Sequence, residues 1–278
     1  MILRKIYKLI RLPKNELFSR IEFRLSRPHL RWLKTLYINF RCLPLCQAIK
    51  LPIYIYGRIK FRSLGSIKIE VENITRGMIK LGNFDNKSAG PTRICNNGEI
   101  VFEGPAYIWE GTLLEIGKDA TLIIGSHSLI GENVHIMLRK FCRIGDYARI
   151  AFESQIMDSD FHYLFNTNTH TIKNCTKPII IGKYNWIGNR TSIKKGTITS
   201  DYTIVAGPNA MLNKDYTSCS AYCILAGSPA KEIANGYRRI FNVNSQEMIT
   251  SFYDNTDTDI PFSMEDDIDE FCNANPLP

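Results

Sequence analysis

Apolar residues recur every six positions through the middle of this 278-residue chain. The period is clear from about Ile116 and is interrupted between about residues 158 and 178 before it resumes. A small residue, most often glycine, follows many of the aliphatic ones. The aliphatic positions follow this period, with a slip of two residues between Ile136 and Ile144, and they are Ile124, Ile130, Ile136, Ile144, Ile150, Ile156, Ile181, Ile187, Ile193, Val205 and Met211. We interpret the pattern as an internal repeat with a unit of six residues.

A six-residue unit is long enough for one short strand and one tight corner. Three such units close a triangular coil of about 18 residues, and stacking places each aliphatic side chain about 4.8 Å from its counterparts above and below. A glycine or alanine beside it permits the strained backbone angles of a corner. Each coil buries its interior only against its neighbours. The pattern therefore predicts a mainly β protein, a parallel β-helix of hexapeptide repeats, whose hand the period alone leaves open.

The repeat divides the chain into three parts. Residues 51–235 are expected to form the β-helix, with irregular early coils and a loop excursion at 158–178. Residues 1–50 carry apolar side chains at helical spacing with arginines between them, so they are expected to form a short basic helical extension, broken by two prolines. Residues 236–278 follow the repeat as an acidic tail.

The charge is distributed unevenly between the two ends. Residues 1–50 carry twelve Lys and Arg against two Glu, whereas residues 240–278 carry nine acids and no Lys or Arg. Residues 1–45 suit an anionic membrane surface, where each Lys or Arg contributes about 1 kcal/mol, and the alternative is a helical cap on the first coil. The acidic tail is interpreted as flexible and solvated. Without a long apolar run, the protein is expected in the cytoplasm or peripherally at the inner face of the cell membrane.

Two motifs mark the later repeats. Residues 185–188 read Asn-Trp-Ile-Gly and residues 226–231 read Ala-Gly-Ser-Pro-Ala-Lys. Together with the hexads, they resemble the hexapeptide-repeat acetyltransferases over about residues 100–233. Residues 158–162, Asp-Ser-Asp-Phe-His, are most similar to the O-acetyltransferases of bacterial capsule and lipopolysaccharide synthesis. The resemblance implies a left-handed coil, a homotrimer, acetyl-CoA as co-substrate and a sugar or glycan as acceptor.

Acyl transfer to a hydroxyl needs a base that takes the hydroxyl proton near neutral pH, and imidazole has a suitable unperturbed pKa. His162 is the candidate because it lies where the coil gives way to the long excursion. Asp158 or Asp160 is expected to accept a hydrogen bond from the other ring nitrogen and so to fix the tautomer. The alternative for His162 is an ordinary surface histidine in a polar loop.

The resemblance also implies which residues bind CoA. Asn189 and Gly207 match positions that contact the pantetheine arm, and Lys231 matches a basic position near the phosphates, with Lys214 assisting. Each has a simpler interpretation as a corner residue or a solvated charge. Pro208 departs from the usual pattern and removes a backbone donor, so local CoA contacts are expected to differ.

The same residues are compatible with some other functions and not with others. A non-catalytic β-helix scaffold or sugar-binding protein fits the repeats equally well, and an N-acetyltransferase for an amino sugar shares the fold. The first hundred residues contain no glycine-rich phosphate loop, which a sugar nucleotidyltransferase would need. The histidine spacing does not match a zinc site, and no nucleic-acid motif appears, so neither a metal nor nucleic acid is expected.

Overall fold

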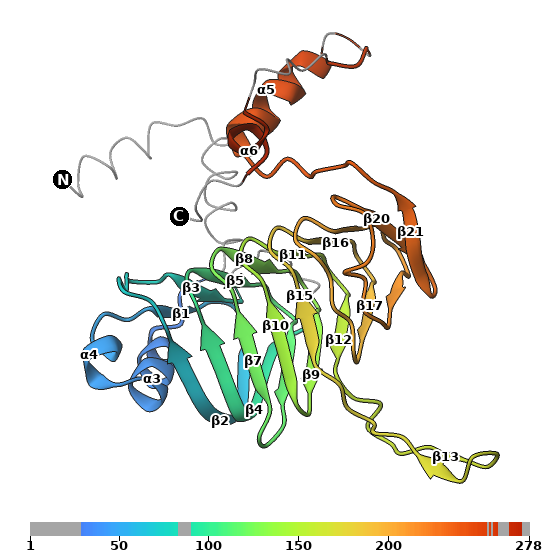
Figure 1. Ribbon diagram of the computed structural model, residues 1–278. Coiled ribbons are helices and arrows are strands. Elements are labelled where there is room, and N and C mark those ends of the chain that lie inside the picture. Colours follow the sequence, from blue (N-terminus) through green and yellow to red (C-terminus); the bar gives the residue numbers. More distant parts are fainter. Residues whose placement is uncertain (1–28, 83–89, 255, 257, 261–266, 274–278) are drawn as a thin grey trace, which may run out of the picture.

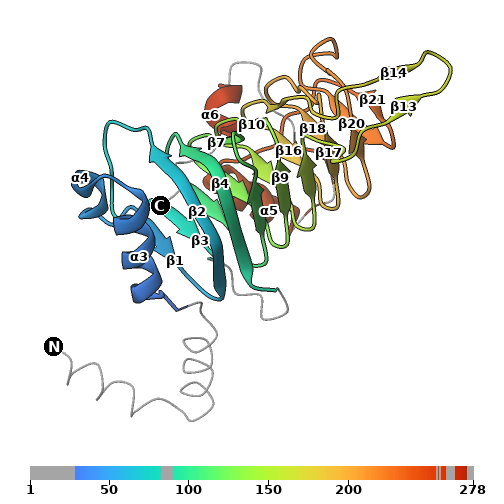
Figure 2. The same cartoon turned by 90° about the horizontal axis from the view of Figure 1, so that it is seen from below.

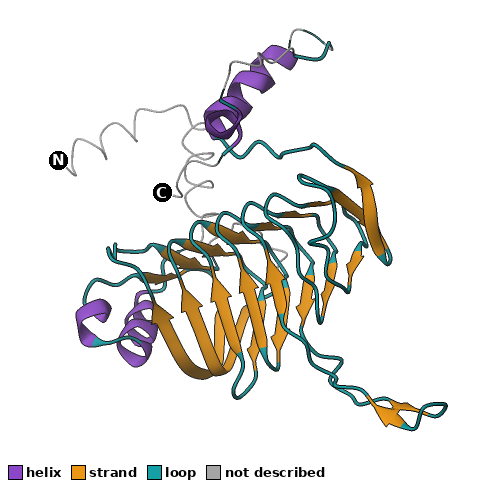
Figure 3. Ribbon diagram, viewed as in Figure 1, coloured by secondary structure: helices purple, strands orange, loops and turns teal. Residues whose placement is uncertain are grey.

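The computed structural model describes residues 29–82, 90–254, 256, 258–260 and 267–273. Its strands wind into a three-sided prism of stacked parallel coils (Figure 1), and strand is the main secondary structure (Figure 3). Buried aliphatic side chains fill the prism as one continuous core. The predicted parallel β-helix is therefore confirmed.

Each face of the prism is a ladder of short strands, one from each coil. The first face contains β1 (Ile53–Ile55), β3 (Ile79–Leu81), β5 (Ala106–Ile108), β8 (Ser128–Ile130), β11 (Arg149–Ile150), β16 (Trp186–Ile187), β18 (Ile204–Val205) and β20 (Ile224–Gly227), and ends with antiparallel β21 (Ala230–Ala234). The second face contains β6 (Leu113–Ile116), β9 (His135–Leu138), β12 (Gln155–Met157), β17 (Ser192–Lys194) and β19 (Met211–Leu212). The third face contains β7 (Thr121–Ile124), β10 (Phe141–Ile144) and β15 (Ile179–Ile181).

Two long early strands, β2 (Ile59–Ile69) and β4 (Thr92–Phe102), extend across both the second and the third face. The first part of β4 pairs with β6, and its last part pairs with β7. These are the irregular early coils that the sequence predicts.

The coil is left-handed, as the resemblance implies. Toward the C-terminus the prism advances from left to right in Figure 1. Each coil passes from the far, first face through the underside, where Figure 2 shows the second face, to the near, third face before crossing back over the top.

The small residues after the aliphatic ones serve close packing between coils. A Cβ on Gly188 would come within 2.4 Å of the backbone nitrogen of Gly207 on the next coil. Gly188 does not have a positive φ, whereas Arg190, two positions later, has φ 56°. The same offset recurs at Gly145 and Tyr147, whose φ is 57°. The expectation that these glycines supply strained corner angles is thus wrong, because non-glycine residues two places on adopt them.

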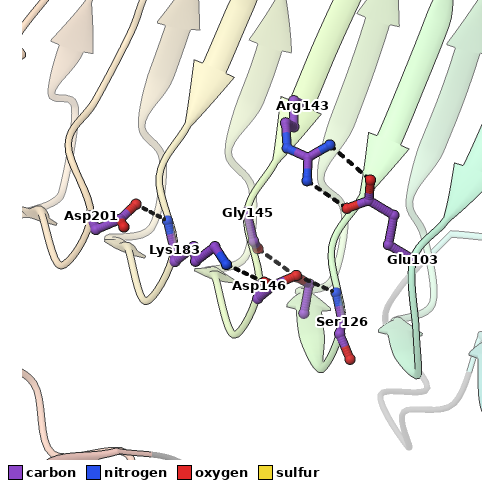
Figure 4. Close-up of polar contacts among 8 residues, drawn as sticks. Glu103, Ser126, Arg143, Gly145, Asp146, Lys183 and Asp201 are labelled. Carbon is purple, nitrogen blue, oxygen red and sulfur yellow. Dashed lines mark hydrogen bonds and ion pairs between the residues drawn. The ribbon is translucent and has the colours of Figure 1, made fainter. Parts of the chain in front are cut away.

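Carboxylates join successive coils at the corners (Figure 4). Asp146 accepts a hydrogen bond from the backbone nitrogen of Ser126 at 2.9 Å, and Asp201 accepts one from Lys183 at 2.7 Å. The Lys183 ammonium in turn lies 2.9 Å from Asp146. These carboxylates thus supply acceptors to backbone N–H groups at the corners.

Helices α3 (Trp32–Cys42) and α4 (Leu45–Ala48) cover the N-terminal end of the prism. The buried amide of Asn39 accepts a hydrogen bond from Ile53 N and donates one to Ile53 O. The Thr35 hydroxyl accepts a hydrogen bond from Ile55 N at 3.0 Å. Polar side chains of α3 therefore hydrogen-bond the backbone groups along the edge of β1 that faces away from the sheet. The helices expected before residue 29 lie outside the described residues.

Helices α5 (Val243–Tyr253) and α6 (Ile268–Cys272) follow the prism (Figure 1). Phe241 is buried, and its ring lies 5.6 Å from that of Tyr184. Arg238 hydrogen-bonds Asp269 at 2.6 Å and lies over the Tyr202 ring. The described residues of the tail thus include two helices that are joined to the prism through Phe241 and Arg238, while most side chains of α5 are exposed to solvent.

Candidate active site

The interruption of the hexads is an arm that projects from the corner between the second and third faces (Figures 1 and 2). The chain leaves after β12 and returns at β15, and the arm contains the antiparallel pair β13 (Phe165–Asn166) and β14 (Thr171–Ile172). At its base, the backbone nitrogen of Asp160 donates to Cys175 O at 2.9 Å. The arm is thus a small two-stranded ladder with a hydrogen-bonded base.

Asp158 is buried at the root of this arm. One of its carboxylate oxygens accepts the backbone N–H of Arg139 at 2.7 Å, and the other accepts those of Lys140 at 2.6 Å and Phe141 at 2.8 Å. These three donors form the corner of the preceding coil, between β9 and β10. In the described structure, the Asp158 carboxylate therefore hydrogen-bonds backbone N–H groups and not His162.

Asp160 has a different partner as well. Its carboxylate forms an ion pair with Lys195, which is mostly buried and also donates to the backbone oxygen of Asn174 at 3.1 Å. Lys195 thereby links both sides of the arm base to the coil that follows. Within one chain, neither candidate acid is brought to His162, so the predicted acid–imidazole pair is not formed.

His162 is exposed on the arm. The residue before it, Phe161, has φ 60°, donates its backbone N–H to the Ser159 hydroxyl at 2.9 Å and packs its ring under the Arg139 guanidinium. No group among the described residues hydrogen-bonds the imidazole of His162. The backbone at this point is held while the ring stays open to a bound molecule.

Asn189 and Gly207 are brought together on neighbouring coils. A Cβ on Gly207 would lie 2.6 Å from the backbone oxygen of Asn189 and 3.1 Å from its side-chain Oδ1. Only glycine allows the two backbones to approach so closely at this corner. Lys214 and Lys231 are both exposed, on the last coils of the prism. The predicted CoA residues thus all lie in the C-terminal part of the prism.

A column of stacked aromatic rings follows the corner that leads into the first face, and it was not predicted. Tyr147 and Tyr184 are stacked with centroids 4.7 Å apart, and Tyr184 and Tyr202 with centroids 5.1 Å apart. His127 and Tyr222 extend the column at its two ends. Burial raises the pKa of Tyr184 to about 12. Each ring stands three positions before an inward aliphatic residue, and this signal was available in the sequence.

Trp186 lies beside this column on the first face, and two arginines surround it. The Arg239 guanidinium sits 4.6 Å from the centre of the Trp186 ring, and Arg149 is the register partner of Trp186 on β11. Burial lowers the pKa of Arg149 to about 10, with the nearby charge of Arg239 contributing. The Arg149 guanidinium donates to the His127 backbone oxygen. Trp186 itself is 39% exposed.

Comparison with known proteins gives a partial sequence match. No protein-family model matches the chain. Over 118 residues it is 33% identical to the polysialic acid O-acetyltransferase of Escherichia coli O1:K1 / APEC, a stretch that covers 42% of this chain and 37% of that protein. The chain therefore matches little more than a third of the length of this relative. The predicted resemblance to sugar O-acetyltransferases is confirmed.

Three solved structures align with most of this chain at low sequence identity. The alignment with the polysialic-acid-specific acetyltransferase NeuO covers 74% of this chain and 88% of the NeuO chain, at 19% identity and a TM-score of 0.42. The alignment with the polysialic acid O-acetyltransferase OatWY covers 70% of this chain and 95% of the OatWY chain, at 20% identity and a TM-score of 0.38. The N-acyltransferase AntD of Bacillus cereus, with dTDP and 3-hydroxybutyryl-CoA, covers 73% and 87%, at 16% identity and a TM-score of 0.37.

Proposed function

We propose that this chain is an acetyl-CoA-dependent O-acetyltransferase that modifies a sugar hydroxyl of a surface polysaccharide or its precursor. The observation that carries the proposal is the exposed His162, which has no hydrogen-bond partner among the described residues, on an arm that interrupts a left-handed β-helix. The partial match to a polysialic acid O-acetyltransferase supports the same reaction.

His162 is assigned the role of general base. Its imidazole takes the proton of the sugar hydroxyl as that oxygen attacks the thioester carbonyl. The carbon–sulfur bond then breaks, and His162 returns the proton to the departing thiolate. Base catalysis of this kind contributes about 10²- to 10⁴-fold in rate.

A neighbouring copy of the chain is proposed to complete the site, in a homotrimer. Asp158 and Asp160 have other partners within their own chain, and no described residue hydrogen-bonds His162, so we assign the group that orients its imidazole to the neighbouring copy. The arm also exposes large apolar side chains to solvent, with Leu164 at 71% and Ile172 at 65%. Exposed apolar surface of this kind is typical of a contact between proteins.

CoA is proposed to bind along the last coils. The close approach of Asn189 and Gly207 leaves backbone and amide groups at one corner, suited to hydrogen bonds with the pantetheine arm. Lys231 and Lys214 are exposed cations near the end of the prism, and neither forms an ion pair within the described residues. Cations without acidic partners suit the phosphates of CoA.

We also propose that the protein works at the inner face of the cell membrane through residues 1–45. In α3 the side chains toward the prism are partly polar, while apolar ones point outward, with Leu33 at 85% and Tyr37 at 54% exposure. Exposed Phe40 and Leu45 continue this surface onto α4. Residues 29–50 contain four Lys and Arg and no acid, a charge that complements anionic lipid. None of the helices in the described ranges has the length and apolar character needed to cross a bilayer.

The reaction is tested by following thiol release from acetyl-CoA with a panel of sugars, amino sugars and oligosaccharides. His162→Ala is expected to lose at least two orders of magnitude in acceptor-dependent release. His170→Ala is the matched control, because His170 is an exposed histidine of the same arm and is expected to keep activity. Equal activity of both variants would assign the base elsewhere, and absence of CoA binding would favour a scaffold.

A further inference from the structure

A basic pocket lies between α3 and the N-terminal strands of the second face. Its cavity has a volume of about 800 Å³. The chemistry of its wall comes from Lys34, Tyr37, Lys60, Arg62, Arg93 and His135. None of these residues belongs to the proposed catalytic or CoA-binding groups, so the pocket requires its own explanation.

The pocket gathers four cations. Among the described residues that line it there is no Asp or Glu. The Lys34 ammonium donates to the backbone oxygen of Ile59 at 2.6 Å, and none of the four cations forms an ion pair with any residue in the described part of the chain. Like charges held together without counter-charges repel one another. A bound anion would remove this repulsion.

The strand register places two of the four cations, Lys60 and Arg93, in one row with His135. Lys60 on β2 pairs with Arg93 on β4, and Arg93 pairs with Leu113 on β6, which pairs with His135 on β9. Neighbouring strands are about 4.8 Å apart, so donors along this row can contact the oxygens of one or two phosphate groups together. Burial, and then the charge of Arg93, lower the pKa of His135.

The position of the pocket indicates the source of the anion. Tyr37 lines the pocket and also belongs to the exposed apolar surface of α3, and its ring lies 6.2 Å from that of Phe61 inside the pocket. The pocket therefore opens beside the surface that we assign to the membrane. Asn189 and Gly207 lie on later coils, toward the opposite end of the prism (Figure 1), so the phosphates of CoA are an unsuitable occupant.

We propose that this pocket binds the phosphate or diphosphate group of a lipid at the membrane surface. The further assignment of that lipid as the carrier of the acceptor glycan rests on the proposed function, whereas phosphate binding does not. Planar guanidinium groups bind phosphate oxygens in pairs, and lysine adds a point charge. The apolar wall of Tyr37 and Phe61 suits the first carbons of a lipid chain.

Phosphate binding is tested by calorimetric titration of the full chain with inorganic pyrophosphate at low salt. Lys60→Ala/Arg93→Ala is expected to weaken binding at least tenfold. Arg76→Ala/Lys118→Ala removes the same charge from exposed positions outside the pocket and is expected to bind like the wild type. Thermal melting of each variant shows whether it is folded, and Arg93→Lys, which keeps the charge, is expected to retain part of the affinity.

The source of the phosphate is tested by flotation with neutral vesicles that contain a few per cent of a polyprenyl diphosphate. The wild type is expected to float with these vesicles and to be displaced by free pyrophosphate, whereas Lys60→Ala/Arg93→Ala stays in solution. Equal loss of binding in both double variants, or no binding of either probe by the wild type, would overturn the proposal. Binding of free pyrophosphate without flotation would overturn the lipid source. None of these readouts uses acetyl transfer, so they stand whether or not the proposed reaction does.

Discussion

The carboxylate of Asp158 accepts the backbone N–H of Arg139 at 2.7 Å, from a residue nineteen positions earlier in the chain. The backbone N–H groups of Lys140 and Phe141 also donate to this carboxylate, and Asp158 is buried. A residue that the sequence places near His162, the proposed base, therefore belongs to the stack of coils. Asp158 and Asp160 should consequently differ in what they do.

Asp158→Asn is expected to destabilise the protein by about 2–4 kcal/mol, because charge-assisted bonds to buried N–H groups contribute about 1.5–3 kcal/mol each and an amide cannot accept all three. Asp160→Asn removes a partly exposed ion pair and is expected to cost about 0–1 kcal/mol. Urea unfolding of the two variants measures both values. Equal effects would show that the buried hydrogen bonds of Asp158 do not stabilise the coil.

Gly207→Ala is expected to weaken both folding and CoA binding. The new Cβ would lie 2.6 Å from Asn189 O, and overpacking of this kind costs about 1–3 kcal/mol. Gly90→Ala, where a Cβ meets no atom within 4 Å, is the control. Melting temperature and the dissociation constant for CoA are measured for both. A Gly207→Ala variant with wild-type CoA affinity would remove Gly207 from the proposed CoA site.

Stability is expected to fall as the pH is lowered from 7.5 to 5.5. The pKa values of His127 and His135 are lowered in the folded protein, mainly by burial. The unfolded chain therefore takes up protons more readily, and stability declines as the pH passes downward through the ordinary histidine value of 6.5.

The measurement is the melting temperature at the two pH values. His127→Asn/His135→Asn should show a smaller pH dependence than the wild type, and His170→Asn, a change on the exposed arm, should not. If the melting temperature of the double variant changed with pH as much as that of the wild type, the pH dependence of stability would come from other groups.

Membrane binding is expected to depend on the outward face of α3. Leu33→Glu/Phe40→Glu places two acids on that face and should abolish flotation with anionic vesicles at low salt, without loss of stability because both side chains are exposed. Met248→Glu on α5 is the control, since Met248 is 56% exposed. This pair of changes is cleaner than deletion of residues 1–45, which would remove the caps on β1. Retained flotation of the double variant would rule out this face.

The hexads predicted the fold because inward side chains repeat locally, once in each strand. Contacts between side chains and other coils join residues that are far apart in the sequence. Asp158 meets its donors only after a full turn, and Phe241 reaches Tyr184 across 57 positions, so neither contact leaves a local pattern. His162 could be singled out because it lies at the break in the repeat, whereas the role of its neighbouring acids depended on the stacking.

The most direct test of the account is transfer of radiolabelled acetyl groups from acetyl-CoA to a purified glycan acceptor, followed by mild alkali. If the chain is an O-acetyltransferase with His162 as its base, label becomes bound to the glycan, alkali releases it because the bond is an ester, and His162→Ala abolishes its incorporation. Label that resists alkali would identify an amide and an amino-sugar acceptor. Incorporation that survives His162→Ala would contradict the assigned base, and no incorporation with any glycan would contradict the proposed reaction.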